Sequence, residues 1–323
     1  MHFWGSRSDI TTISCGVPQG SILGPLLFLL YINDLGTIFN NLNTILFADD
    51  SNLIANGTSL PELERKINND IPLLTSWLQT NRLSLNLKKT HVMIFGRGSR
   101  TRDHHMNINI EGTTLDIVHE TKFLGIIVDN CLNWKAHTSY LHKKLSKSIG
   151  ILSRARKFLN LPTLKQLYFS FLFPYLSYGN IIWGSAAEIT LDPIFKIQKR
   201  AIRIITNTRR RDSTKLIFQE LNLLRLPDIY IFSALIFMYQ FKNKTLPPPF
   251  DNFYYENRAF HHYRTRQATQ LRVPLTRTKM ASSFIKKTGV SLWNSYSTKI
   301  SSNLKIGVYK TELTKILIAT SSE

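Results

Sequence analysis

Apolar side chains recur with a helical period across residues 61–79. They fall on one face of the predicted helix: Leu63, Ile67, Ile71, Leu74 and Leu78. Ser59 or Thr58 can cap this helix, and Pro61 suits its first turn. The pattern therefore predicts an amphipathic helix whose apolar face packs against a sheet.

The strands of that sheet are predicted from shorter patterns. Residues 44–55 carry apolar runs on either side of Asp-Asp-Ser-Asn, which is typical of a β-hairpin with its acids at the turn. Residues 107–118 alternate in polarity around Glu111-Gly112 and predict a second hairpin. Residues 91–95 and 122–129 each predict one further strand.

A long apolar stretch follows a segment rich in glycine and proline near the start of the chain. Residues 16–25 hold three glycines and two prolines, which predicts a loop whose backbone can approach another group closely. Residues 26–35 are apolar on nearly every side of a helix, so we expect a buried helix there.

The second half of the chain is predicted to be helical. A helix that begins near Asn133 has an apolar face made of Leu141, Leu145, Ile149, Leu152 and Leu159. A second helix, at residues 192–206, turns inward Ile194, Ile197, Ala201 and Ile204. Basic residues lie around both apolar faces: Lys143, Lys144, Lys147, Arg154, Arg156, Lys157, Lys196, Lys199, Arg200 and Arg203. Residues 214–242 predict further helices, and residues 245–257, with three consecutive prolines, predict a linker.

Composition narrows the class of protein. Hydrophobic residues make up 43% of the 323 positions, as in globular proteins, and two cysteines cannot build a disulfide framework. We find no signal-peptide pattern at the start, and the apolar stretches are too short to span a bilayer. These features favour an intracellular protein without a membrane segment.

The net charge of +20 is concentrated in the second half. Residues 1–129 carry 10 lysines and arginines against 12 aspartates and glutamates, a balance of −2, whereas residues 130–323 carry 31 against 9, a balance of +22. Such an excess is typical of proteins that bind a polyanion, and without a lipid-insertion pattern nucleic acid is the expected partner. Residues 258–277 mix basic and aromatic side chains, which suits a single strand, although a partly disordered basic arm fits equally well.

Asp49 and Asp50 are the candidate metal ligands. Two like charges at a turn between apolar strands are unfavourable unless a cation lies there. Mg²⁺ takes carboxylate oxygens, and phosphoryl-transfer enzymes use such ions to bridge incoming and leaving oxygens. The alternative from these residues alone is an ordinary exposed hairpin turn.

Four motifs, taken in order, favour the metal site. They are Gly16-Val17-Pro18-Gln19-Gly20, Phe47-Ala48-Asp49-Asp50, Leu85-Asn86-Leu87-Lys88-Lys89-Thr90 and Phe123-Leu124-Gly125. Together they resemble the reverse transcriptases of non-LTR retrotransposons, most closely the jockey-like group, over about residues 13–129.

The resemblance implies an α+β fold in three parts. Residues 1–130 would form part of a polymerase palm, with an antiparallel sheet and helices. Residues 131–212 would form a basic, all-helical thumb, and residues 213–323 a basic helical extension with a proline-rich linker near 246–250. The implied reaction is DNA synthesis on an RNA template with Mg²⁺ or Mn²⁺, in which the 3′-hydroxyl of a DNA primer attacks the α-phosphate of a dNTP.

The roles of individual residues follow from the same resemblance. Asp49 and Asp50 would hold the metal ion, and Lys89 would protonate or bind the leaving pyrophosphate. Nucleotide and template would contact Gly16, Pro18, Gln19, Gly20, Phe47 and Ala48. The primer grip would be Phe123, Leu124 and Gly125. The duplex backbone would lie along Lys143, Lys147, Arg154, Lys196, Lys199, Arg200 and Arg203.

One carboxylate of the resembled pattern has no counterpart. Such polymerases hold two metal ions with carboxylates from two segments, the first of which lies upstream of the Pro-Gln-Gly loop, and Asp9 is the only acid before Gly16. We therefore expect an N-terminally truncated fragment that is inactive alone, because the second ion would be poorly held. The alternative function is that of a non-enzymatic remnant that binds nucleic acid.

Overall fold

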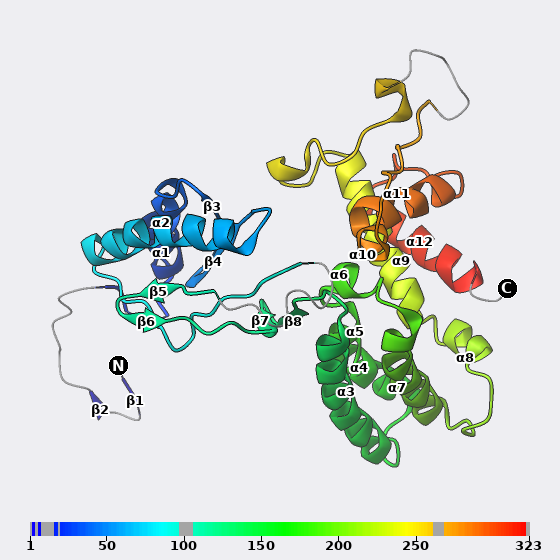
Figure 1. Ribbon diagram of the computed structural model, residues 1–323. Helices are drawn as coiled ribbons and strands as arrows, with labels where there is room; N and C mark the ends of the chain where they lie inside the picture. Colours follow the sequence, from blue (N-terminus) through cyan, green and yellow to red (C-terminus); the bar gives the residue numbers. More distant parts are fainter. Residues whose placement is uncertain are drawn as a thin grey trace. The chain divides into compact units, whose positions relative to one another are not determined.

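A computed structural model describes residues 2–3, 6–7, 16–18, 20–96, 106–260 and 268–320. Contacts within the chain form two compact units, Met1–His119 and Glu120–Glu323. Both units combine helices with antiparallel strand pairs, as Figure 1 shows. The predicted α+β class is confirmed.

The first unit is a series of hairpins and helices. In its described part the elements follow one another as β1 (His2–Phe3), β2 (Ser6–Arg7), α1 (Gly24–Ile32), the 3₁₀ helix η1 (Asn33–Thr37), β3 (Leu42–Phe47), β4 (Asp50–Ala55), α2 (Leu60–Thr80), β5 (Asn109–Ile110) and β6 (Thr113–Thr114). Each strand pairs antiparallel with its neighbour in sequence. Among the described residues, the strands thus form separate two-stranded hairpins.

Helix α2 forms where the sequence predicts it, and its first turn is capped from both sides. The Ser59 hydroxyl accepts the Glu62 amide at 3.4 Å, and the Glu62 carboxylate accepts the amide and the hydroxyl of Thr58 at 2.8 Å each. Pro61 lies in the first turn, where its missing N–H is not needed. The ammonium of Lys66, and then Thr58, lower the pKa of Glu62 to about 2.

Two apolar clusters lie along α2. One joins α2 to α1, η1 and the β3–β4 hairpin through Ile32, Leu35, Leu46, Leu53, Leu74 and Trp77. The other joins α2 to the β5–β6 hairpin and its flanking residues through Ile71, Ile94, Met106, Ile108, Ile110 and Leu115. The predicted apolar face of α2 is confirmed, because all five of its residues belong to one or the other cluster.

Asp70 ties α2 to the start of β3. The residue is 1% exposed, and its carboxylate accepts the Asn41 amide at 2.7 Å, the Asn41 side-chain amide at 2.8 Å and the Leu42 amide at 3.1 Å. A hydrogen bond to a charged group contributes about 1.5–3 kcal/mol, and without such bonds a buried carboxylate would be strongly unfavourable. Asp70 therefore fixes the point at which the β3–β4 hairpin begins.

The helix predicted at residues 26–35 forms as α1 and η1, but the expectation that it is buried is wrong. Ile32 and Leu35 are buried, whereas Leu26, Leu29 and Leu30 are 55%, 52% and 67% exposed. An all-apolar helix has no polar face to mark which side meets the core. Burial of this helix therefore cannot be read from its own sequence.

Two of the predicted strands are wrong as well. Residues 91–95 make no strand, since Val92 forms only an isolated parallel bridge with Ile117. Residues 122–129 make a hairpin instead of one strand, because the chain reverses at Leu124 and Gly125. The hairpin predicted at residues 107–118 is confirmed as β5–β6.

The second unit opens with a hairpin and continues with helices. The hairpin is β7 (Glu120–Phe123) and β8 (Ile126–Asp129), and the described helices are α3 (Lys135–Ala155), α4 (Leu161–Phe171), α5 (Phe173–Ser177), α6 (Asn180–Trp183), α7 (Glu188–Thr206), α8 (Lys215–Glu220), α9 (Leu226–Lys242), η3 (Pro248–Phe250), η4 (Asn257–Ala259), α10 (Lys279–Ser283), α11 (Ile285–Tyr296) and α12 (Ile306–Thr320). Every helix in the described part of the chain is too short or too polar to cross a membrane.

Helices α3 and α7 confirm the two amphipathic helices predicted in this half. Their apolar faces pack into one cluster with α4, α5 and α6, and the residues at its centre include Leu145, Leu152, Ile194 and Ala201. Leu159 departs from the prediction, because it follows the end of α3 and is 39% exposed.

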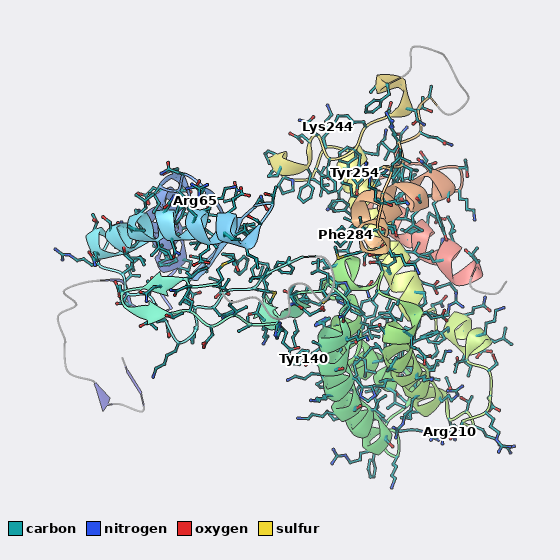
Figure 2. The ribbon with its side chains drawn as sticks, in the orientation of Figure 1. Arg65, Tyr140, Arg210, Lys244, Tyr254 and Phe284 are labelled. Atoms are coloured by element: carbon teal, nitrogen blue, oxygen red, sulfur yellow. The ribbon has the colours of Figure 1, made fainter. Side chains whose placement is uncertain are left out.

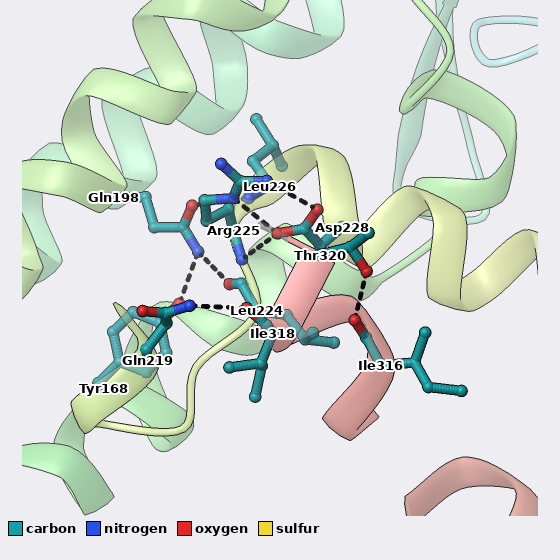
Figure 3. Close-up of polar contacts among 10 residues, drawn as sticks. All are labelled: Tyr168, Gln198, Gln219, Leu224, Arg225, Leu226, Asp228, Ile316, Ile318 and Thr320. Carbon is teal, nitrogen blue, oxygen red and sulfur yellow. Dashed lines mark hydrogen bonds and ion pairs between the residues drawn. The ribbon is translucent and has the colours of Figure 1, made fainter. Parts of the chain in front are cut away.

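Gln198 of α7 connects three helices inside this cluster, as Figure 3 shows. Its side-chain amide donates to the Tyr168 hydroxyl and to the Leu224 carbonyl, both at 2.9 Å, and its carbonyl accepts the Leu226 amide at 2.8 Å. Burial raises the pKa of Tyr168. Both polar ends of this buried glutamine are satisfied, which specifies how α4, α7 and the start of α9 meet.

A second cluster surrounds α9. It joins α9 to α11 and α12 through residues that include Leu235, Met238, Val290, Trp293 and Leu313. The proline-rich stretch belongs to this part of the fold, since Phe250 of η3 lies with its ring centroid 5.4 Å from that of Phe237 on α9. The C-terminal helices therefore have a core of their own.

Replacing Asp70 with alanine is expected to destabilise the first unit. The amides of Asn41 and Leu42 would lose their acceptor, and an unsatisfied buried donor costs about 1–3 kcal/mol. We expect a loss of about 2–4 kcal/mol in urea unfolding and faster hydrogen exchange at these two amides. Asp116→Ala, which removes an exposed carboxylate from the same unit, should change stability by less than about 0.5 kcal/mol. Unchanged exchange in Asp70→Ala would contradict the anchoring role.

Candidate active site and nucleic-acid interface

The predicted carboxylate hairpin is confirmed as β3–β4. Leu42 pairs with Ala55 at one end and Phe47 with Asp50 at the other, so Ala48 and Asp49 form a two-residue turn. Ala48 has a φ of +50°, in the left-handed region that costs a residue with a Cβ about 1–2 kcal/mol. The turn presents Asp49, and the first residue of β4 presents Asp50.

The two faces of this hairpin have different surroundings. Leu46 and Leu53 lie on the face that packs toward α2. Asp50 lies directly opposite Phe47, and paired residues share a face. That face is open, because Phe47 is 59% and Ile45 48% exposed. Asp50 is therefore accessible beside an aromatic ring.

Asp49 and Asp50 suit a hard divalent cation, because both are exposed carboxylates on adjacent residues. The sequence has no lysine or arginine from residue 8 to residue 64, so no cationic side chain from this stretch can take the place of the ion. Within the described residues no group of three or more His, Cys, Asp or Glu side chains converges to hold a metal. The pair thus offers part of a coordination sphere, and further ligands would have to come from substrate phosphates or water.

The glycine-rich loop leads into α1. The Ser21 amide donates to the Pro18 carbonyl at 3.1 Å, and the Ser21 hydroxyl accepts the Gly24 amide at 2.9 Å. Gly16 and Gly20 have φ values of +75° and +88°, and no described atom lies within 4 Å of the position of a Cβ at either. The predicted loop is confirmed for these residues, and its backbone is open to a ligand. Gln19 lies outside the described residues.

Lys89 lies in an exposed turn with local contacts. Its amide donates to the Asn86 carbonyl at 2.9 Å, and its carbonyl lies 3.1 Å from Nδ1 of His91. In the described part of the chain, no hydrogen bond or ion pair joins Lys89 to Asp49 or Asp50. The role proposed for Lys89 therefore rests on its sequence motif.

Phe123, Leu124 and Gly125 lie at the tip of the β7–β8 hairpin. Leu124 and Gly125, with φ values of +45° and +84°, make its two-residue turn. The Tyr178 hydroxyl donates to the Leu124 carbonyl at 2.6 Å, and a Cβ on Gly125 would lie 3.4 Å from the Tyr178 ring. This contact spans 54 positions, so Tyr178 could not be found from a local sequence pattern.

His137 supports the same hairpin from α3. It is 2% exposed, and its Nδ1 accepts the Ile127 amide of β8 at 3.3 Å. Its ring meets the Trp183 ring edge to face, with centroids 5.5 Å apart. Burial lowers the pKa of His137 to about 4, so the imidazole is neutral at pH 7.

The basic residues of α3 form a stripe opposite its buried face. Lys143, Lys147 and Arg154 fall within a narrow sector of the helix, and all three are exposed. The Lys144 ammonium lies 5.6 Å from the ring centroid of Tyr140, which is labelled on α3 in Figure 2. Nε of Arg154 donates to the Gly150 carbonyl at 3.3 Å, and the exposed side chains of all three stripe residues can contact a phosphate backbone.

The basic residues of α7 are partly engaged within the protein. Lys196 pairs with Asp192 at 2.6 Å, and the Lys199 ammonium lies 4.0 Å from the Phe195 ring centroid. The Arg203 guanidinium donates to the Asp212 carbonyl at 2.9 Å. Arg200 is exposed. Arg200, and Lys199 with the N–H donors that a ring contact leaves available, can meet a phosphate without breaking an ion pair or hydrogen bond among the described residues.

Comparisons with known proteins agree with these motifs. Residues 2–128 match the family described as reverse transcriptase (RNA-dependent DNA polymerase). The chain is 28% identical over 213 residues to the RNA-directed DNA polymerase from mobile element jockey of Drosophila funebris, which covers 62% of this chain and 23% of that protein. It is 27% identical over 239 residues to the probable RNA-directed DNA polymerase from transposon X-element of Drosophila melanogaster, which covers 69% and 26%. Residues 2–128 are a reverse transcriptase domain of the jockey-like type.

The reverse transcriptase domain contains the carboxylate hairpin and ends within β8. A retrovirus-related Pol polyprotein from the type-1 retrotransposable element R1 of Bradysia coprophila is also similar, at 28% identity over 216 residues, covering 65% of this chain and 21% of that protein. The chain spans about a quarter of the length of these curated relatives. No solved structure shows a significant match to it.

Lowering the pH below 6.5 is expected to destabilise the second unit through His137. The unfolded chain binds a proton near pH 6.5, whereas the folded chain binds it only near pH 4, so stability falls as the pH drops between these values. We expect a loss of about 2 kcal/mol between pH 7 and pH 5, measured by urea unfolding. His137→Gln should flatten this dependence, while His142→Gln, exposed on the same helix, should keep it. An equal dependence in both variants would contradict the assignment.

Proposed function

We propose that this chain is part of an RNA-directed DNA polymerase of a non-LTR retrotransposon, which acts inside the cell on an RNA template, a DNA primer and dNTPs. The observation that carries the proposal is the β3–β4 hairpin, which presents Asp49 and Asp50 at an exposed turn of the reverse transcriptase domain. The reaction joins the primer 3′-oxygen to the α-phosphorus of the dNTP and releases pyrophosphate.

Asp49 and Asp50 would hold Mg²⁺ or Mn²⁺ in this reaction, since carboxylates are the ligands that these cations prefer. When bound, such an ion offsets negative charge on the phosphates and favours the ionised form of the primer hydroxyl. The left-handed backbone at Ala48 keeps both carboxylates at the end of the hairpin. The Phe47 ring beside Asp50 offers an apolar surface for the sugar or base of the nucleotide.

The remaining motif residues receive binding roles in this proposal. The backbone of Gly16, Pro18, Gln19 and Gly20, with Ala48, would contact nucleotide and template, and Lys89 would meet the leaving pyrophosphate. Phe123, Leu124 and Gly125 would hold the primer end. We assign residues 1–130 to the palm, 131–212 to the thumb and 213–323 to the C-terminal extension.

The duplex backbone would lie along the exposed basic helix residues. Lys143, Lys147 and Arg154 of α3 present their charges to solvent, and the balance of +22 in residues 130–323 supports contact with a polyanion. Lys196, Lys199, Arg200 and Arg203 of α7 would add to this contact.

We further propose that these 323 residues bind primer and template without extending the primer. Two divalent cations need more oxygen ligands than one pair of neighbouring carboxylates supplies. The described residues bring no third acidic, histidine or cysteine side chain into a group with Asp49 and Asp50.

Metal-directed cleavage tests the role of Asp49 without relying on synthesis. Fe²⁺ in place of Mg²⁺, with ascorbate and peroxide, should cut the backbone near residues 47–51, because the radicals form at the bound ion. Asp49→Ala should abolish these cuts, whereas Asp116→Ala should keep them. Cuts that persist in Asp49→Ala would contradict the metal assignment.

Primer extension on an RNA template, with the same preparations and Mg²⁺, tests the inactivity proposal. We expect no extension by the unchanged chain or by Asp49→Ala, and equal binding of primer–template by both. Extension that depends on Asp49 would contradict the inactivity proposal and support a complete catalytic centre.

Removing the α3 stripe should weaken duplex binding in a salt-dependent way. Each phosphate contact contributes about 0.9 to the slope of log K against log[salt], so the combined change of Lys143, Lys147 and Arg154 to alanine should reduce that slope by about 2–3. Fluorescence anisotropy between 50 and 200 mM salt measures it. The matched control replaces Lys299, Lys305 and Lys310, which are exposed near and on α12; equal slopes in the two triple variants would contradict the role of α3.

A further inference from the structure

A pocket of about 200 Å³ opens between the segment that follows α9 and the start of α11. Its walls include Phe253, Tyr255, Phe260, Arg272 and Lys286. It lies outside the reverse transcriptase domain, and no step proposed above uses it. A pocket of this size is smaller than the roughly 300–1,000 Å³ of sites that enclose drug-sized ligands, which limits it to about one flat ring.

The framework of the pocket is anchored to α11. Tyr254, labelled in Figure 2, is 6% exposed, and its hydroxyl donates to the carbonyl of the first residue of α11 at 2.9 Å. Asn294 of α11 donates to the Leu271 carbonyl at 2.8 Å and accepts the Leu271 amide at 3.2 Å. The Arg272 amide donates to the Tyr255 carbonyl at 2.8 Å. The pocket is therefore formed before any ligand arrives.

Aromatic rings and cations alternate around the opening. Tyr255 and Phe260 are 49% and 50% exposed, and their rings are nearly perpendicular, with centroids 6.0 Å apart. The Arg272 guanidinium lies 4.0 Å from the Phe260 centroid, and the Lys286 ammonium lies 5.0 Å from that of Phe253. Cations stacked on rings keep N–H donors free for an anion.

The charge around the pocket is positive. Residues 253–260 and 268–290 carry six lysines and arginines and one acid, Glu256. Glu256 is engaged by Lys242 at 2.8 Å and by Arg258 at 2.6 Å. The pocket thus combines exposed rings with cations that have no acidic residue of these segments to neutralise them.

We propose that this pocket takes one base of a single-stranded nucleic acid, stacked on Phe260 with its edge toward the perpendicular Tyr255 ring, while Arg272 and Lys286 hold neighbouring phosphates. Stacking on an exposed ring beside a basic groove is how single strands are bound without sequence preference. A duplex would not fit, because its bases are already stacked. An acidic peptide would use the cations but would leave the exposed rings without a partner.

The inference stands apart from the polymerase proposal, since binding is measured without synthesis and Asp49 takes no part. The probes are a fluorescein-labelled 12-mer of uridines, the deoxythymidine 12-mer, and an abasic ribose-phosphate 12-mer of equal charge. Phe260→Ala should weaken binding of both base-containing strands by about 5- to 100-fold, as for the loss of one stacked base. It should leave binding of the abasic strand unchanged. Loss with only one of the two base-containing strands would contradict stacking on Phe260, because both strands present a pyrimidine ring.

Two further variants separate stacking from folding and from charge. Phe260→Trp, which retains a ring, should keep the affinity, and its fluorescence should be quenched by bound bases. Arg272→Ala should reduce the salt slope by about 0.7, whereas Lys310→Ala, which removes one exposed charge elsewhere, should leave it unchanged if the pocket is the site. Three results would each overturn the proposal. The first is a Phe260→Ala affinity within twofold of that of the unchanged protein, and the second is a loss of affinity for the abasic strand equal to that for the base-containing strands. The third is competition by polyglutamate equal to that by the nucleic acid.

Discussion

A buried carboxylate on α2 determines where the β3–β4 hairpin begins. Asp70 accepts both N–H groups that would otherwise be unpaired at the start of β3, those of Asn41 and Leu42. Strand pairing then fixes the register, and eight residues after Leu42 the chain reaches Asp50. A shift of one residue at Asp70 would exchange the two faces of the hairpin and turn the Asp50 side chain toward α2. The position of Asp49 and Asp50 therefore depends on a buried residue that lies outside the hairpin.

The second unit also contains a buried aspartate that accepts main-chain amides at one end of a hairpin. Asp129 at the end of β8 is 8% exposed and accepts the amides of Cys131, Asn133 and Trp134 at 3.1, 3.1 and 2.9 Å. Its carboxylate thereby holds the turn that connects the β7–β8 hairpin to α3. In both units a short hairpin with little core of its own is positioned by a buried acid that satisfies main-chain donors at one end.

The sequence predicts the elements whose own pattern distinguishes polar from apolar positions. Helices α2, α3 and α7 carry a polar face that identifies the apolar one, and the acids of Thr44–Ala55 mark a turn. The pattern does not predict burial in α1, because that helix has no polar face. It also does not predict the hairpin at residues 122–129, where Gly125 divides the apolar run. Tyr178, His137 and Asp70 were missed because their roles come from contacts with distant segments, and an isolated tyrosine, histidine or helix aspartate carries no local signal. The motif residues of the candidate site were found through their order along the chain, whereas the chemistry of the aromatic pocket depends on Phe260 meeting Arg272, which only the fold brings together.

The division of charge along the chain follows from the two tasks proposed for it. An ammonium or guanidinium group beside a carboxylate pair weakens the binding of Mg²⁺, and the stretch from residue 8 to residue 64 contains no lysine or arginine. A phosphate backbone is held by the opposite composition, which residues 130–323 supply. If the basic residues were spread evenly, those near Asp49 would neutralise it, and those left on α3 would be too few to retain a template. In the proposed function, separation of the two signs in sequence would let one chain hold a cation at one place and a polyanion at another.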